Sequence, residues 1–170
     1  FNTHSIHKYP DIYTGYKYTS LLYNIPIDRI CLTQGSEQGI GLVLSYLNNK
    51  KIHTALPTFG MTEVHSKIHG CDKIDIEYVF KDDRFEIDYI GDHEILYIAS
   101  PDNFTGYRIT PDDVMSIARS CEYLILDCAY LKLVELTGYL ELLSKCNNIF
   151  ILHTASKYYA GPGIRLGFIF

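Results

Sequence analysis

The sequence predicts an α/β fold built on a mostly parallel sheet. Short β-branched or aromatic runs alternate with segments that have helical spacing, which is typical of repeated βα units. Several of these runs are apolar throughout, as expected for strands that are buried on both faces of a sheet. The chain has 170 residues, of which 47% are hydrophobic and 21% charged. That length is enough for one domain with a substantial core, and two full domains would be crowded.

Seven strands are predicted from the apolar runs. They cover Arg29 to Thr33, Ile52 to Leu56, Lys73 to Tyr78, Glu94 to Ala99, Tyr123 to Asp127, Asn148 to His153 and Leu166 to Phe170. The segments between them show apolar spacing compatible with helices packed on one side. These helices cover Glu37 to Leu47, Met61 to His69, Pro111 to Ser120 and Glu135 to Cys146.

Two of these helices have recognisable start signals. Ser36 supplies an oxygen that can cap the first helix, and Thr110 precedes a proline, Pro111, at a position where helices accept one. In open α/β sheets, ligands gather beyond the carboxyl ends of the strands. The loops that follow the predicted strands are therefore the first place to look for a functional site.

Composition favours small-molecule partners in a reducing compartment. The formal charge is −5, and lysines are interspersed with acidic residues, so no basic stripe indicates a nucleic-acid partner. The five cysteines are odd in number and never in CxxC spacing, which favours a reducing cytoplasm over a disulfide framework or a zinc site. No apolar run approaches the roughly 20 residues that span a bilayer. We interpret the seven histidines as surface or core residues rather than metal ligands.

Two predicted strands are followed by polar residues that could contact a ligand. Asn103 lies in the turn Ser100 to Gly106, where it could present its amide to a ligand or simply form an Asn/Gly turn. Asp127 ends the apolar run Tyr123 to Asp127, and a carboxylate at such a position is either functional or a helix cap.

A lysine follows a third predicted strand. Lys157 lies in His153-Thr-Ala-Ser-Lys157, and glycines then lead to Arg165. Desolvation can depress the pKa of a lysine until its amine is nucleophilic enough to form a Schiff base. The alternative is a surface lysine, and considered alone that reading is the stronger one.

The segment Gln34-Gly-Ser-Glu37 joins a strand to a helix. Its backbone N–H groups and Ser36 could hold an anion at the helix N-terminus, or Ser36 could serve only as a cap. The segment is neither a GxGxxG fingerprint nor a Walker loop, which disfavours a nucleotide-binding doubly wound domain.

Together these segments resemble the fold-type-I pyridoxal-phosphate enzymes, and among them the histidinol-phosphate aminotransferase branch. Pro101 to Gly106 is similar to the family's Pro-Asn-Asn-Pro-Thr-Gly, with Asp102 and Phe104 as the two departures. Asp127-Cys-Ala-Tyr130 stands for Asp-Glu-Ala-Tyr, and Thr154-Ala-Ser-Lys157 for Thr-Leu-Ser-Lys. Gly163-Ile-Arg-Leu-Gly167 resembles the family's Gly-Leu-Arg-Leu-Gly. The blocks occur in the family's order from Tyr9 to Gly167.

The resemblance implies a three-layer sandwich whose last strand is antiparallel. It also implies that pyridoxal 5'-phosphate is bound covalently by Lys157, which then moves a proton during the reaction. Asp127 would pair with the pyridine nitrogen, and Asn103 and Tyr130 would hydrogen-bond the phenolic oxygen of the ring. The phosphate would contact the backbone at Ser36 and Glu37, together with the side chains of Thr154 and Arg165.

Two further positions are implied by the same resemblance. Phe59 matches an aromatic residue that stacks on the cofactor ring, and the alternative is that it fills the core. Tyr9 matches a tyrosine that reaches the phosphate in a neighbouring subunit, which implies a homodimer; the alternative is an exposed residue of an N-terminal arm. We expect residues 1–14 to form that arm and 15–170 the large domain, with the family's C-terminal small domain absent from this chain.

The departures from the family pattern affect different things. Cys128 replaces the glutamate beside Asp127, which changes local hydrogen bonding, and Phe104 removes a proline that would rigidify the turn around Asn103. The resemblance implies transamination of an amino acid or of a phosphorylated amino alcohol. The alternatives are decarboxylation of a phosphorylated amino acid and a truncated domain that binds the cofactor without turnover.

Overall fold

A mixed sheet of eight strands forms the centre of the protein, in a computed structural model that describes residues 9, 11–87 and 93–170. The order across the sheet is β1-β8-β7-β6-β5-β2-β3-β4. The strands are β1 (Cys31–Thr33), β2 (Lys51–Leu56), β3 (Asp72–Lys81), β4 (Arg84–Ile87), β5 (His93–Ala99), β6 (Cys121–Asp127), β7 (Ile149–Thr154) and β8 (Gly167–Ile169). The α/β class is thus confirmed.

The centre of the sheet is parallel and both of its ends are antiparallel. β3, β2, β5, β6 and β7 run in the same direction. β8 is antiparallel to both β7 and β1, which confirms the expectation for the last strand. β4 is antiparallel to β3. The carboxyl ends of β5, β6 and β7 therefore lie side by side at one edge of the sheet.

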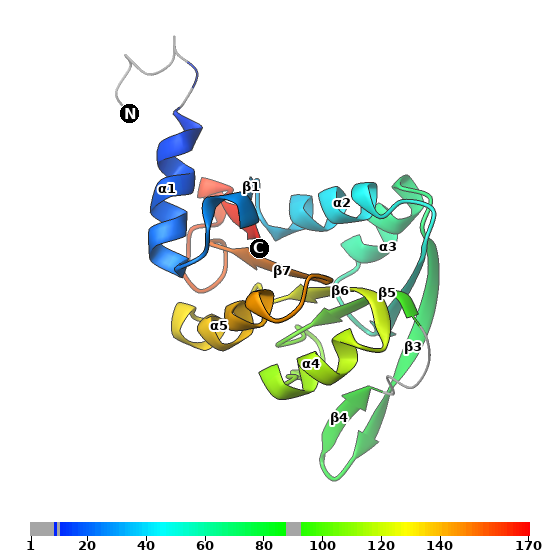
Figure 1. The fold of residues 1–170 in the computed structure, drawn as a ribbon. Coiled ribbons are helices and arrows are strands. Elements are labelled where there is room, and N and C mark those ends of the chain that lie inside the picture. The colour runs from blue at the N-terminus through cyan, green and yellow to red at the C-terminus, as the bar shows by residue number, and fades with distance from the viewer. Residues whose placement is uncertain (1–8, 10, 88–92) are drawn as a thin grey trace.

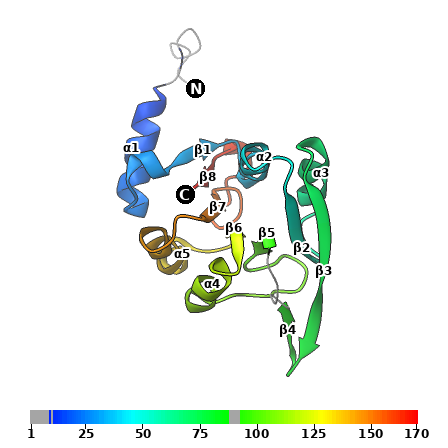
Figure 2. The same ribbon diagram turned by 45° about the vertical axis from the view of Figure 1, so that its right-hand side comes forward.

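Helices cover both faces of this sheet, as Figures 1 and 2 show. The helices are α1 (Ile12–Tyr23), α2 (Ser36–Tyr46), α3 (Met61–Ile68), α4 (Pro111–Ala118) and α5 (Leu133–Leu140), with short 3-10 turns at Ile27–Arg29, Glu141–Ser144 and Pro162–Ile164. α2 and α3 lie on one face, and α4 and α5 on the other, with α1 beside α5. This is the predicted three-layer arrangement.

Two apolar clusters hold the layers together, one on each face of the sheet. Leu124 and Leu126 of β6 face the cluster that includes α4 and α5, while Ile125 faces the cluster under α2. All three side chains are fully buried. Consecutive residues of a strand point to opposite faces, so a run that is apolar throughout is what a doubly covered strand requires.

The predicted helix starts had different outcomes. Thr110 caps α4 as expected, because its side chain accepts a hydrogen bond from the Asp113 N–H and a proline occupies the first turn. The expected cap at Ser36 is wrong, since the cap position of α2 is Gly35, with φ 86°, and Ser36 is the first helical residue. No side-chain hydrogen bond caps α2 in the described part of the chain. Its first N–H groups are therefore available to a ligand.

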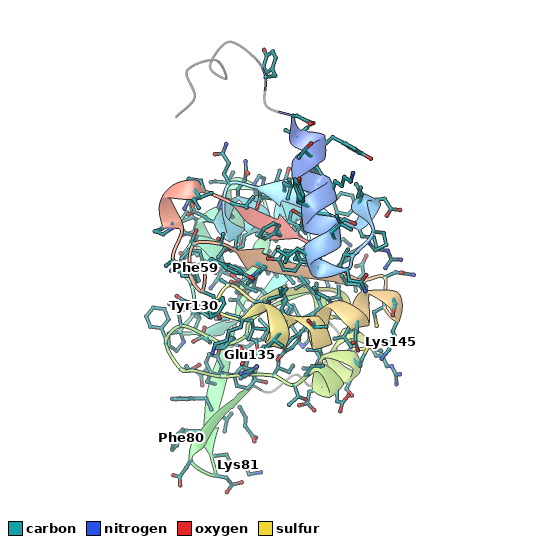
Figure 3. The ribbon with its side chains drawn as sticks, turned by 90° about the vertical axis from the view of Figure 1, so that its left-hand side faces the viewer. Phe59, Phe80, Lys81, Tyr130, Glu135 and Lys145 are labelled. Carbon is teal, nitrogen blue, oxygen red and sulfur yellow. The ribbon has the colours of Figure 1, made fainter. Side chains whose placement is uncertain are left out.

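Two elements were not predicted. α1 precedes the first predicted strand, and it crosses the expected boundary between arm and large domain at residues 14 and 15. β4 forms a hairpin with β3 that projects from the body of the protein, with Phe80 and Lys81 near its tip (Figure 3). Among the described residues, no helix combines the length and the apolar character needed to cross a membrane.

Candidate active site

A cleft of about 220 Å³ opens at the carboxyl edge of the parallel strands. It brings together nine of the ten side chains that the sequence singled out. They are Ser36, Glu37, Phe59, Asn103, Asp127, Tyr130, Thr154, Lys157 and Arg165. These residues come from loops far apart in the sequence, and they meet because their strands end at the same edge.

Lys157 and Tyr130 form the outer wall of the cleft. Lys157 follows β7, it is exposed, and its Nζ lies 5.2 Å from the centre of the Tyr130 ring. That distance permits a cation–π contact, which holds the ammonium over the ring while leaving it accessible. The lysine is therefore not simply a solvated surface residue, because its amine is directed at a residue of the same cleft.

Asp127 forms the floor of the cleft at the end of β6. Its side chain accepts hydrogen bonds from the Tyr97 hydroxyl at 2.8 Å and from the Ala129 N–H at 3.0 Å. Burial raises the pKa of Asp127, while the two hydrogen bonds and the charge of Lys157 oppose the rise and the charge of Asp102 adds to it. A buried carboxylate of this kind gains from a cationic partner, because the partner favours its ionised form.

Tyr97 was not singled out from the sequence, although it holds Asp127 in place. It is 1% exposed, and burial followed by the charge of Asp127 raises its pKa well above the ordinary value. The phenol therefore stays protonated and acts as a donor. Tyr97 shares its strand face with Ala99, which pairs with Asp127 across β5 and β6, and only the structure reveals this register.

The opposite end of the cleft is built to hold an anion. The N-terminus of α2 opens onto it at Gly35 and Ser36, and Arg165 lies beside it, donating from its guanidinium to the Gln34 carbonyl at 3.0 Å. Thr154 and Ser156 complete this end, with hydroxyl oxygens 3.0 Å apart. Backbone N–H groups, a guanidinium and hydroxyls are the donors that a phosphate requires.

Ser156 is a second residue whose role the sequence reasoning missed. It lines the cleft, and its N–H donates to the Thr154 hydroxyl at 3.2 Å. The signal was its place in the segment Thr154 to Lys157, where it stands two residues from a candidate phosphate contact and one from the candidate cofactor lysine.

Gly167 allows the anion-binding loop to lie directly on β8. A Cβ added to Gly167 would lie 2.3 Å from the carbonyl carbon of Gly35 and 2.7 Å from its Cα. Both atoms are backbone, so no side-chain rotation can relieve the clash. The glycine therefore fixes how closely the N-terminus of α2 approaches the loop that carries Arg165.

We expect Gly167→Ala to destabilise the protein by about 3 kcal/mol, as overpacking against backbone does. Gly163→Ala is the matched control, because a Cβ there meets nothing within 4 Å. Its effect should be below about 0.5 kcal/mol. Urea unfolding of both variants measures the difference, and equal free energies of unfolding would contradict this reading of the loop.

Tyr9 stands apart from the other candidates. It is 100% exposed and does not line the cleft of its own chain. Phe59, by contrast, is partly buried at the cleft wall, and Figure 3 shows it on the same side of the molecule as Tyr130. Phe59 and Tyr130 of this chain therefore both contribute aromatic rings to the cleft wall.

Beneath the cleft, Cys128 and His153 face the core. The Cys128 thiol is fully buried, and burial raises its pKa well above the ordinary value. His153 Nδ1 lies 2.9 Å from the Cys128 carbonyl oxygen, within hydrogen-bonding distance. The replacement of glutamate by cysteine thus places an uncharged side chain in an apolar environment.

The remaining histidines include one pair with helical spacing. His65 and His69 are four residues apart at the end of α3, and their rings stack with centroids 6.1 Å apart. Within the described ranges, no group of three histidine, cysteine or acidic side chains is arranged to hold a metal ion.

A family model and several curated proteins match this chain. Residues 3–170 match the family model for aminotransferase class I and II. The chain is 32% identical over 155 residues to histidinol-phosphate aminotransferase of Pyrococcus furiosus, covering 86% of this chain and 44% of that protein. It thus spans about half the length of such relatives.

Solved structures share the fold. Histidinol-phosphate aminotransferase from Sinorhizobium meliloti, in complex with pyridoxal-5'-phosphate, has a TM-score of 0.83 at 21% identity, over 98% of this chain and 49% of that one. L-Threonine-O-3-phosphate decarboxylase from Porphyromonas gingivalis has a TM-score of 0.80 at 17% identity, over 99% of this chain and 52% of that one.

Proposed function

Because this chain belongs to the class I and II aminotransferase family, we propose that it forms the cofactor-binding domain of a pyridoxal-phosphate-dependent aminotransferase. The observation that carries the proposal is the single cleft that joins Lys157, the buried Asp127 and the anion-binding end at Arg165. An amine, a carboxylate and a phosphate cup at the ends of neighbouring strands match the aldehyde, the ring nitrogen and the phosphate of this cofactor.

Lys157 and Asp127 have distinct roles in this proposal. Pyridoxal phosphate supplies an electron sink for bonds at the substrate's amino-bearing carbon. Lys157 holds the cofactor covalently and, once its amine is free, accepts a proton from the substrate's Cα. Asp127 keeps the ring nitrogen protonated, because a carboxylate beside a ring favours the cationic form.

The other residues bind and orient the cofactor. Asn103 and Tyr130 donate to the phenolic oxygen of the ring, and Phe59 stacks on its face. The N–H groups at Ser36 and Glu37 hold the phosphate together with Thr154 and Arg165, and Ser156 adds a hydroxyl to the cup.

The assembly and its compartment are part of the same proposal. Tyr9 is free to reach a second copy of the chain, which supports a homodimer in which it contacts the neighbouring phosphate. We place the protein in the cytoplasm, since its five cysteines are free. The division into an arm of residues 1–14 and a large domain of residues 15–170 stays part of the proposal, with its boundary inside α1.

The proposed substrate is an amino acid or a phosphorylated amino alcohol such as histidinol phosphate. Protein loaded with pyridoxal phosphate should transfer an amino group from one member of such a panel to a keto acid, which chromatography of the products detects. Release of carbon dioxide from a phosphorylated amino acid would instead identify a decarboxylase. Full cofactor occupancy without turnover of any panel member would identify a cofactor-binding domain.

A further inference from the structure

Asp102 lies next to the candidate ligand Asn103 and is itself 3% exposed. Its Oδ2 accepts a hydrogen bond from the Thr58 hydroxyl at 2.7 Å. Its Oδ1 accepts from the Phe104 N–H at 2.9 Å and from both the N–H and the hydroxyl of Thr105, at 2.9 and 3.0 Å. These four donors satisfy the buried carboxylate. Without hydrogen-bond partners its burial would destabilise the folded state.

The hydrogen bond from Phe104 closes a ring around Asn103. The residue before Asn103 supplies the acceptor and the residue after it supplies the donor. Backbone bonds tighten the same loop, because the Asp102 N–H donates to the Tyr107 carbonyl at 2.9 Å and the Gly106 N–H donates to the Asp102 carbonyl at 3.1 Å. The position of Asn103 is therefore fixed from both sides.

This bond requires one departure from the family's Pro-Asn-Asn-Pro-Thr-Gly pattern and is strengthened by the other. A proline at position 104 would have no N–H to donate, so the bond exists only because Phe104 stands there. The ring of Phe104 is 64% exposed and contributes little packing. Asp102 adds a full negative charge where the family has a neutral amide, and hydrogen bonds to a charged acceptor are roughly twice as strong as neutral ones.

We propose that Asp102 is a positioning residue for cofactor binding, and that its bond to the Phe104 N–H replaces the rigidity that a proline would give the Asn103 loop. Asp102 acts through the backbone on either side of Asn103. The two departures therefore compensate for each other, and the loop keeps a rigid shape by a different physical means. The proposal rests on the proposed function, because it assigns Asn103 to the cofactor.

A double-mutant cycle tests this coupling. Asp102→Asn removes the charge, and Phe104→Pro removes the donor, so each single variant should bind pyridoxal phosphate about tenfold more weakly. The double variant recreates the proline-containing motif and should bind within about threefold of the wild type. Phe104→Ala keeps the N–H and is the matched control, with unchanged affinity.

The measurement is the dissociation constant of pyridoxal phosphate, obtained from the visible absorbance of the purified protein. If the two substitutions weakened binding only by destabilising the fold, the double variant would bind more weakly than either single variant. Affinity restored in the double variant therefore cannot come from general destabilisation. A double variant that binds about a hundredfold more weakly, the product of the two single effects, would overturn the proposal.

Hydrogen exchange of the Phe104 and Thr105 amides keeps the test independent of the cofactor. In cofactor-free protein both amides should be protected, and Asp102→Ala should accelerate their exchange by about tenfold or more. Equal exchange rates with and without Asp102 would refute the coupling. A third outcome is that Asp102→Ala accelerates exchange as expected while neither the wild type nor any variant binds pyridoxal phosphate. In that case the proposed function and the positioning role both fail, and the hydrogen bonds of the loop are still confirmed.

Discussion

Lys157→Ala protein is expected to lose the visible absorption band of covalently bound pyridoxal phosphate. The substitution removes the amine that attaches the cofactor, so only the phosphate cup and the ring contacts remain to hold it. Amine transfer should also fall by roughly 10²–10⁴-fold, because the group that moves the substrate proton is absent. Absorption spectra of the two proteins at equal cofactor concentration measure the first effect, and a coupled transfer assay measures the second.

Lys132→Ala is the matched control for this variant. Lys132 is exposed, and its Nζ lies 5.7 Å from the centre of the Tyr158 ring, so it too is a lysine held over a tyrosine near the cleft. The control should keep both the band and the activity. Loss of the band in Lys132→Ala but not in Lys157→Ala would move the cofactor lysine to another position.

The second large effect is expected from Asp127→Asn. Asparagine has nearly the same shape and can keep partners for the Tyr97 hydroxyl and the Ala129 N–H, but it has no charge to stabilise a protonated ring nitrogen. Removing such a preorganised electrostatic contact should lower the rate of amine transfer by roughly 10²–10³-fold. Steady-state kinetics of the fully loaded variant measure this loss.

A measurement of the stability of Asp127→Asn distinguishes a loss of catalysis from a loss of folded protein. Burial raises the pKa of Asp127, so its stabilising contribution is fully present below the unfolded-state pKa and is lost as the pH rises from there through the raised pKa. The neutral asparagine avoids this loss. Cofactor-free Asp127→Asn should therefore resist urea at neutral pH at least as well as the wild type. The role of Asp127 would be contradicted if fully loaded Asp127→Asn protein transferred amino groups within threefold of the wild-type rate.

The fold was largely predictable because its central strands are buried on both faces. An apolar run such as Leu124 to Leu126 has no alternative location in a protein of this size, and all seven predicted strands are present. α1 was missed because Ile12, Leu21 and Leu22 are exposed, so its apolar residues do not form a single buried stripe. β4 was missed because it is short and belongs to a hairpin that projects from the body of the protein.

The site residues that lie at or after the end of a predicted strand could be predicted from the sequence. The contacts that join two strands, or that form within a turn, could not. Asp127 could be found because it ends an apolar run, and Lys157 because the segment Thr154 to Lys157 resembles the family's Thr-Leu-Ser-Lys. The bond from Tyr97 to Asp127 depends on the register between β5 and β6, which the sequence does not reveal. Three of the four bonds to Asp102 come from a turn whose shape follows from its own hydrogen bonds, and the fourth comes from Thr58 in another loop. The cap of α2 was misassigned because Gly35 takes a positive φ.

Borohydride reduction would show whether Lys157 carries the cofactor. Reduction fixes pyridoxal phosphate to the amine that holds it, and peptide mass spectrometry then locates the added mass. We expect the phosphopyridoxyl group on the peptide containing Lys157 in wild-type protein, and its absence in Lys157→Ala. A label on another lysine, or no label in protein saturated with pyridoxal phosphate, would contradict the assignment of the cofactor to Lys157.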